Sequence, residues 1–167
     1  VISYKPTVVT VMLGMNDGNY RAHEQAIFDT YSGGYEHLMT TLKSALPGLR
    51  MTLIQPSPYD DVTRAATFEG GYNAVLIRYG QFIKELAQKQ HLDLADMNTP
   101  VVAMLDKAKQ EDSALAQQII PDRIHPGPGG HLIMAEALLE AWHAPSLVTS
   151  VEIDAAGKRV VRVDNTE

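Results

Sequence analysis

The sequence TVVTVMLGMND, residues 7–17, specifies the architecture of this chain. It opens with seven consecutive apolar or β-branched residues, which follow Pro6 and end at Gly14. A strand that is apolar on both of its faces fits a sheet that helices cover on both sides. We therefore predict a buried parallel strand at 7–13, with the polar residues of a loop at its carboxyl end.

Helix and strand patterns alternate after this segment. Apolar residues recur at helical spacing from Gly34 to Leu46, and Pro47-Gly48 ends the pattern. The expected strands are 7–13, 51–54 and 91–95, and the expected helices are 34–46, 72–87, 100–109 and 131–142, with a short turn within 115–120. This order predicts an α/β fold of flavodoxin-like type, a three-layer parallel sheet with helices on both faces.

The end of the chain follows a different pattern. Val151 and Ile153, and then Val161 and Val163, alternate with polar residues on either side of a turn at 155–158. Alternation of this kind predicts a β-hairpin. We therefore expect an α/β domain over residues 1–145 and a β-hairpin extension over residues 146–167.

Composition excludes several classes of protein. The chain has 14 Lys and Arg against 20 Asp and Glu, a net charge of −6, and no cluster of basic residues, so it is not expected to bind nucleic acid. No apolar run approaches the roughly 20 residues that cross a bilayer, so no membrane span is predicted. Without cysteine there is no disulfide, thiol nucleophile or cysteine-based zinc site. Histidines at metal-binding spacing are also absent, so no metal and no cofactor is predicted.

Asn16 is the first candidate for chemistry, because open α/β sheets bind ligands at the carboxyl ends of their strands. The sequence Asn16-Asp17-Gly18 also favours a simple turn. In the functional alternative, the side-chain N–H of Asn16 donates to an oxyanion, an interaction worth about 2.7–4 kcal/mol where it has been measured. The residues alone leave both interpretations open.

The second candidate is the pair Asp122 and His125, in a segment, 120–130, that three prolines stiffen and that is expected to be irregular. Pro126 disfavours helical backbone at His125, so the imidazole is expected to be presented rather than packed. Asp122 would accept from one ring nitrogen and leave the other free as a base. The spacing Asp-x-x-His also arises by chance, so the setting carries more weight than the spacing.

Other polar residues receive structural interpretations. Asp60-Asp61 is expected to be a solvated turn, and its place after a predicted strand leaves a substrate rim as the alternative. Four of the other five histidines lie in polar contexts and are interpreted as surface groups. His131 opens the last helix and is expected beside the candidate site.

The order of these motifs resembles that of the SGNH (GDSL-type) hydrolase superfamily of esterases, lipases and carbohydrate deacetylases. Gly14-Met15-Asn16-Asp17 matches the third sequence block of that superfamily and Asp122-Arg123-Ile124-His125 the fifth, within a resemblance that spans about residues 6–142. The resemblance implies that Asn16 is an oxyanion-hole donor, that His125 is the general base and that Asp122 orients it. Gly14, Asp17 and Ser57 would then belong to the oxyanion and substrate region.

One part of the family pattern is missing. In the superfamily the nucleophilic serine lies in a Gly-Asp-Ser block on the first strand and an oxyanion glycine follows the second, and both precede the Gly-x-Asn-Asp block. Only 15 residues precede Asn16, and their one serine, Ser3, has no Gly-Asp before it. We therefore expect that this chain lacks the first two strands and is inactive alone, and that a further chain or segment supplies them. Ser57, between two prolines at a strand end, is the one other serine in the right region and is interpreted as a rigid loop residue.

The resemblance implies a serine ester hydrolase that removes a small acyl group such as acetate, with a small ester or an acylated carbohydrate as substrate. Enzymes that resemble this sequence are often exported, so a secreted or periplasmic location is the corresponding expectation. The alternative is a non-catalytic, flavodoxin-like binding module or pseudo-enzyme. A Gly-Asp-Ser sequence on a strand upstream of Val1 would favour the enzyme.

Overall fold

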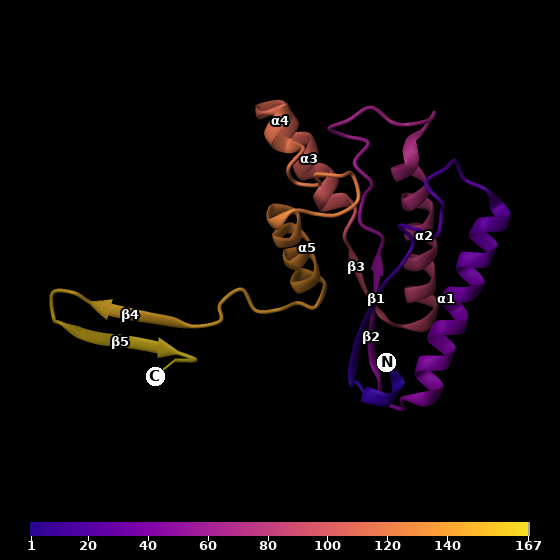
Figure 1. Cartoon of the computed structure of the whole chain (residues 1–167). Helices are drawn as coiled ribbons and strands as arrows, with labels where there is room; N and C mark the ends of the chain where they lie inside the picture. The colour runs from indigo at the N-terminus through magenta and orange to yellow at the C-terminus, as the bar shows by residue number, and fades with distance from the viewer. Residues whose placement is uncertain (167) are drawn as a thin grey trace.

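Figure 1 shows the computed structural model, which describes residues 1–166. The chain begins with a short 3-10 helix, Ile2–Tyr4. The elements that follow are β1 (Val8–Met12), α1 (Gln25–Ala45), β2 (Arg50–Gln55), α2 (Gly71–Gln90), β3 (Asp93–Asp96), α3 (Thr99–Glu111), α4 (Ser113–Ala116), α5 (Pro128–Ala141), β4 (Ser150–Asp154) and β5 (Arg159–Asp164). The order of strands and helices is the order that the sequence predicts.

Strands β1, β2 and β3 form a parallel sheet in that order. Val11 pairs with Leu53, and Leu53 in turn pairs with Leu94. Parallel neighbours need crossover connections, which α1 and α2 provide. The predicted α/β fold with a parallel sheet is therefore confirmed.

Helices cover both faces of this sheet. One core cluster joins β1 and β2 to α1 and α2, and Leu53 is fully buried in it. The second cluster packs Ile54 of β2 against Leu105 of α3 and Met134 of α5. Neighbouring residues of a strand point to opposite faces, which explains why Leu53 and Ile54 enter different clusters. The result is the three-layer arrangement that the strand and helix patterns predict.

Two helices start earlier than the sequence pattern indicates. α1 begins at Gln25 rather than near Gly34, and it runs through Gly33 and Gly34 without a break. Glycine has low helix propensity, but this weak preference yields to tertiary packing, which here includes the buried Tyr31. α5 begins at Pro128, inside the segment expected to be irregular, because proline is favoured in the first turn of a helix.

β1 pairs with β2 alone among the described strands, so its other side is an edge of the sheet. Val11 belongs to the first core cluster and the partly buried Val9 packs against it, whereas Val8 and Met12 are each 45% exposed. A groove of about 540 Å³ runs along this edge, lined by β1, α1 and the first residues of the chain. An apolar strand with an unpaired edge favours the addition of a further strand.

β4 and β5 form an antiparallel hairpin, which extends away from the α/β body in Figure 1. Its apolar side chains Val151, Ile153 and Val163 are 50%, 65% and 49% exposed. The predicted C-terminal hairpin is confirmed, and the division into domains at residues 145 and 146 stays a prediction. None of the helices in residues 1–166 has the length and hydropathy needed to span a membrane.

Candidate active site

The loop after β1 places Asn16 at the carboxyl end of the sheet. Gly14 ends the strand with a φ of +131°, and a Cβ atom there would approach Pro56 Cγ to 2.7 Å. Glycine accepts this backbone angle, and its missing side chain permits the close approach. The turn then closes through hydrogen bonds from Asp17 N to Gly14 O (3.2 Å) and from Asn19 N to Asn16 O (3.1 Å). Gly14 therefore fixes the direction in which Asn16 leaves the strand.

Three tyrosines of α1 and α2 support the same strand end by donating their hydroxyl groups to main-chain carbonyl oxygens. These hydrogen bonds run from Tyr35 to Val11 (3.1 Å), from Tyr31 to Leu13 (3.2 Å) and from Tyr72 to Met15 (2.6 Å). Burial raises the pKa of all three phenols, that of Tyr72 to about 12, so they remain protonated donors. One carbonyl group of β1 and two of its loop are thereby satisfied by side chains.

Asp122 and His125 lie in a tight turn. Asp122 Oδ1 accepts from the backbone N–H groups of Ile124 (3.0 Å) and His125 (2.7 Å). Asp122 Oδ2 accepts from the ring Nδ1 of His125 at 2.6 Å. Arg123 between them has a φ of +75°, a left-handed conformation that tightens the turn. The other ring nitrogen of His125, Nε2, is therefore free to accept a proton. The His125 side chain is 80% exposed.

The hydrogen bonds of this turn set the charge on the pair. The backbone N–H of His125, followed by its ring N–H and the backbone N–H of Ile124, holds the pKa of Asp122 far below its usual range. The carboxylate therefore stays ionised and keeps the imidazole proton on Nδ1. A pair in this state can take a proton from a hydroxyl group that approaches Nε2.

Two arginines join this turn to the loop that follows β2. Arg64 donates to the carbonyl oxygens of residues 120 and 121, at 3.1 and 2.7 Å, directly before Asp122. Arg123 donates in the opposite direction, to the carbonyl oxygens of residues 60 and 65, at 3.4 and 2.9 Å. We call this reciprocal set of bonds the arginine exchange. It offsets the strain of the positive φ at Arg123, about 1–3 kcal/mol, and holds the two loops together.

Asp60 is the fully buried centre of the arginine exchange. Its carboxylate accepts from the backbone N–H groups of Val62 (3.1 Å) and Thr63 (2.8 Å), from the Thr63 hydroxyl and from Arg64 Nη1 (2.6 Å). The side chain of Asp61 is only 12% exposed. The prediction of a solvated turn at Asp60-Asp61 is therefore wrong, because both side chains are largely buried and the Asp60 carboxylate is satisfied by protein groups rather than by water.

A cavity of about 480 Å³ brings the two candidate motifs together. Asn16, Ser57, His125 and His131 all line it. Most of the remaining lining is apolar and includes Met12, Met15, Ile54, Met97, Met134, Ala135 and Leu138. The fold thus places a side-chain amide, a histidine and a serine around one apolar space.

The other predicted site residues lie elsewhere. Asp17 lines a separate pocket of about 320 Å³ beside α1, so it does not share the cavity of His125. Asp122 contacts His125 from outside the cavity lining, and Gly14 is buried at the strand end. Ser57 is only 7% exposed, and within residues 1–166 its hydroxyl makes no hydrogen bond to His125. The structure therefore groups Ser57 with His125 and separates Asp17 from both.

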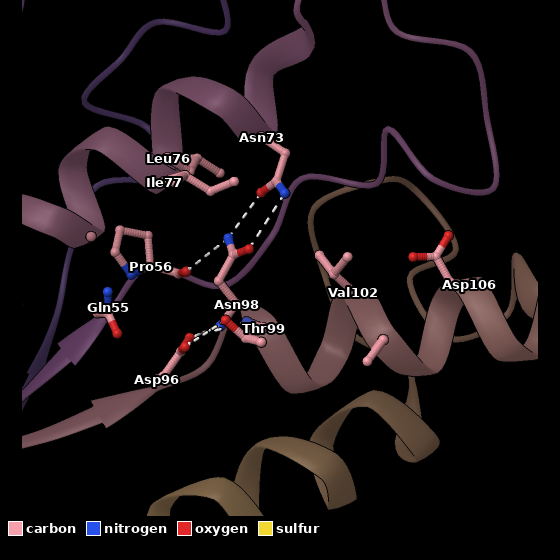
Figure 2. A pocket seen from close by; sticks show the side chains of 12 residues that line it. Gln55, Pro56, Asn73, Leu76, Ile77, Asp96, Asn98, Thr99, Val102 and Asp106 are labelled. Carbon is pink, nitrogen blue, oxygen red and sulfur yellow. Dashed lines mark hydrogen bonds between the residues drawn. The ribbon is translucent and has the colours of Figure 1, made fainter.

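A further pocket, of about 370 Å³, lies between α2 and α3 (Figure 2). Asn98 Nδ2 donates to Asn73 Oδ1 at 2.9 Å across this pocket. At the start of α3, Asp96 accepts from the backbone N–H of Thr99 (3.0 Å) and from its hydroxyl (2.6 Å), which caps the helix. Asn73 is thus bound to Asn98, and Asp96 to Thr99. Among the described residues none lines both this pocket and the cavity of His125.

Sequence reasoning missed three residues that support the candidate site, namely Tyr20, Asp60 and Arg64. The hydroxyl of Tyr20 donates to Asn16 Oδ1. Tyr20 lies four positions after Asn16, and Arg64 lies four positions after Asp60. This spacing predicts a contact on a helix but not in a loop. No sequence signal links Arg64 to the distant carbonyl groups at 120 and 121.

A family model, that of the GDSL-like lipase/acylhydrolase family, matches residues 1–133. A search of curated proteins finds no match. Among solved structures, a gut microbial diltiazem-metabolizing enzyme is 28% identical, with a TM-score of 0.81 over 97% of this chain. Axe2, an acetylxylan esterase from Geobacillus stearothermophilus, is 21% identical, with a TM-score of 0.62 over 84% of this chain. At this identity the similarity concerns the fold alone. This chain spans 39% of the first of these proteins and 61% of the second.

Proposed function

Because the chain belongs to the GDSL-like lipase/acylhydrolase family, we propose that it carries the general base and one oxyanion donor of a serine esterase. His125 is the proposed base, Asp122 orients it, and Asn16 is the proposed donor. The observation that best supports this assignment is the 2.6 Å hydrogen bond from His125 Nδ1 to Asp122 Oδ2, beside a cavity that Asn16 also lines. A structural turn alone would not require a histidine at that cavity.

In the proposed reaction, a serine hydroxyl attacks the carbonyl carbon of an ester while His125 Nε2 takes the hydroxyl proton. The carbonyl electron pair moves onto oxygen, and the Asn16 Nδ2–H group donates to this oxyanion. The tetrahedral intermediate collapses and expels the alcohol, which leaves with the proton from His125. Water then attacks the acyl-serine in the same way, which releases the carboxylic acid and restores the serine. Asp122 stays ionised throughout and stabilises the imidazolium.

We place the nucleophilic serine in a polypeptide segment beside β1, outside these 167 residues. Ser57 lines the cavity, but its low exposure between two prolines restricts its approach to His125 Nε2. The unpaired edge of β1 and the groove of about 540 Å³ beside it are compatible with a further parallel strand. Such a strand would end beside Met12, which lines both the groove and the cavity. On this proposal the 167-residue chain alone is inactive.

The proposed substrate is a small ester, such as an acetylated carbohydrate. The apolar lining beside His125 suits an acyl group, and the 80% exposure of the His125 side chain leaves room in solvent for a bulky alcohol such as a sugar. Axe2, which shares the fold, is an acetylxylan esterase. We expect kcat/KM on p-nitrophenyl esters to be highest for acetate and to fall as the acyl chain lengthens.

Hydrolysis of p-nitrophenyl acetate and labelling by a fluorophosphonate probe test this function. The full-length protein should show both, and His125→Ala should lower kcat by about 10²–10⁴. His37→Ala, on the exposed surface of α1, is a matched control that should retain turnover. The 167-residue chain should show neither labelling nor hydrolysis above the background of a free imidazole.

Two results would contradict parts of the proposal. Stoichiometric labelling of Ser57 in the 167-residue chain would refute a nucleophile from another segment. A folded full-length protein that is inert toward the whole ester series would refute the esterase and favour a non-catalytic binding module or pseudo-enzyme.

A further inference from the structure

We propose that Tyr20 is a positioning residue for the oxyanion donor, because its hydroxyl fixes the orientation of the Asn16 carboxamide. This inference rests on the proposed function of Asn16. The phenol O–H of Tyr20 donates to Asn16 Oδ1. The two ends of the planar amide differ, so a donor at Oδ1 leaves the Nδ2 end as the one that can donate elsewhere. Asn16 lines the cavity of His125, so that is where Nδ2 is needed.

The position of Tyr20 is itself held by other aromatic residues. Its ring centroid lies 5.0 Å from that of Tyr72 and 6.1 Å from that of Tyr59. Tyr72 is fixed by its hydrogen bond to Met15 O, and Tyr59 lies under the guanidinium of Arg123, 5.7 Å from the ring centroid. Tyr20 therefore packs against two aromatic rings, each of which is held by a contact of its own.

The backbone of Tyr20 also indicates a specific role. Its φ is +54°, in the left-handed region, and so is that of Asn19 before it. Two consecutive residues with side chains seldom adopt this conformation, which costs free energy that the surrounding contacts must offset. The strained turn brings the Tyr20 hydroxyl back to a side chain four positions earlier.

The charge state of Tyr20 suits a donor. Desolvation, followed by the neighbouring Tyr59 and the Asp122 carboxylate, raises the pKa of the Tyr20 phenol. The hydroxyl therefore keeps its proton at neutral pH and can donate it to Oδ1. A hydrogen bond that Oδ1 accepts also polarises the amide, which strengthens the N–H groups at its other end.

A double-mutant cycle in the full-length protein tests this role. Tyr20→Phe removes the hydroxyl and keeps the ring, and it should lower kcat about 2- to 12-fold, as expected for the loss of one neutral hydrogen bond. The KM should stay the same, because the oxyanion forms after substrate binding. In an Asn16→Ala background, Tyr20→Phe should have no further effect on kcat. Tyr4→Phe is the matched control, since Tyr4 is 88% exposed, and it should leave kcat unchanged.

Two results of this cycle would overturn the role proposed for Tyr20. The first is an unchanged kcat in Tyr20→Phe. The second is a fall in kcat that is equal with and without the Asn16 amide, because a residue that only supports folding acts independently of Asn16. A second readout does not depend on catalysis. In protein labelled with ¹⁵N-asparagine, Tyr20→Phe should shift the side-chain NH₂ resonances of Asn16, and unchanged resonances would exclude the hydrogen bond. If the full-length protein has no esterase activity, the proposed function fails, while this spectrum still decides whether Tyr20 orients Asn16.

Discussion

Replacement of Asp60 by alanine should destabilise the protein by about 3–5 kcal/mol, because it removes one partner of a buried ion pair. Asp60 is fully buried, and Arg64, its partner at 2.6 Å, is 20% exposed. The substitution also leaves the backbone N–H groups of Val62 and Thr63 without their acceptor. For a domain of this size the loss corresponds to a fall in Tm of about 6–20 °C. Chemical unfolding followed by circular dichroism measures it.

Asp96→Ala provides the matched comparison. Asp96 accepts two backbone N–H groups and a hydroxyl, as Asp60 does, but it caps α3 and pairs with no arginine in the described chain. Loss of a helix cap costs about 0.5–2 kcal/mol. Asp60→Asn, which keeps an acceptor but removes the charge, should fall between the two. If Asp60→Ala lowers stability no more than Asp96→Ala, then the arginine exchange does not hold the loops together as we argue.

Three further predictions concern the full-length protein. His125→Ala should lower kcat by about 10²–10⁴, far more than Asp122→Ala, because the first substitution removes the proton acceptor and the second removes only the group that orients it. Equal losses of kcat would contradict these roles. Asn16→Ala should lower kcat by about 10²–10³ with little change in KM or Tm, whereas a mere turn residue would lower Tm and leave kcat per folded molecule intact. Gly14→Ala should destabilise the fold by about 1–3 kcal/mol, because the new Cβ meets Pro56 Cγ at 2.7 Å and the φ of +131° is strained; an unchanged unfolding midpoint would count against this packing.

The fold was predictable because its signals are local. The apolar run at 7–13 and the helical spacing between Tyr72 and Ala87 are each carried by one segment, and their alternation indicates a parallel sheet. The start of α1 was not predictable, because Gly33 and Gly34 weaken the local helical signal and packing against the sheet overrides it. Local patterns therefore predict the elements but not where tertiary contacts extend them.

The candidate site was predictable only in part. Asn16, Asp122 and His125 stand out because each follows a recognisable local pattern, and the fold places Asn16 and His125 on one cavity. The burial of Asp60 depends on Arg64, which also donates to carbonyl oxygens 56 and 57 positions further along the chain, and no local pattern reports such contacts. The position of Asp17 in another pocket depends on how the turn after Gly14 closes, which the sequence leaves open.

The bond between α5 and the sheet has a spectroscopic consequence. Trp142, the single tryptophan of the chain, follows the last residue of α5, and its indole N–H donates to Thr52 Oγ1 on β2 at 2.8 Å. Indole emission responds to local polarity, so fluorescence reports the docking of the helix that supplies Met134 and Leu138 to the cavity wall. The hairpin of β4 and β5 lies apart, and an isolated hairpin is marginally stable. Tryptophan emission will therefore follow the opening of the cavity wall and remain unchanged when the hairpin melts.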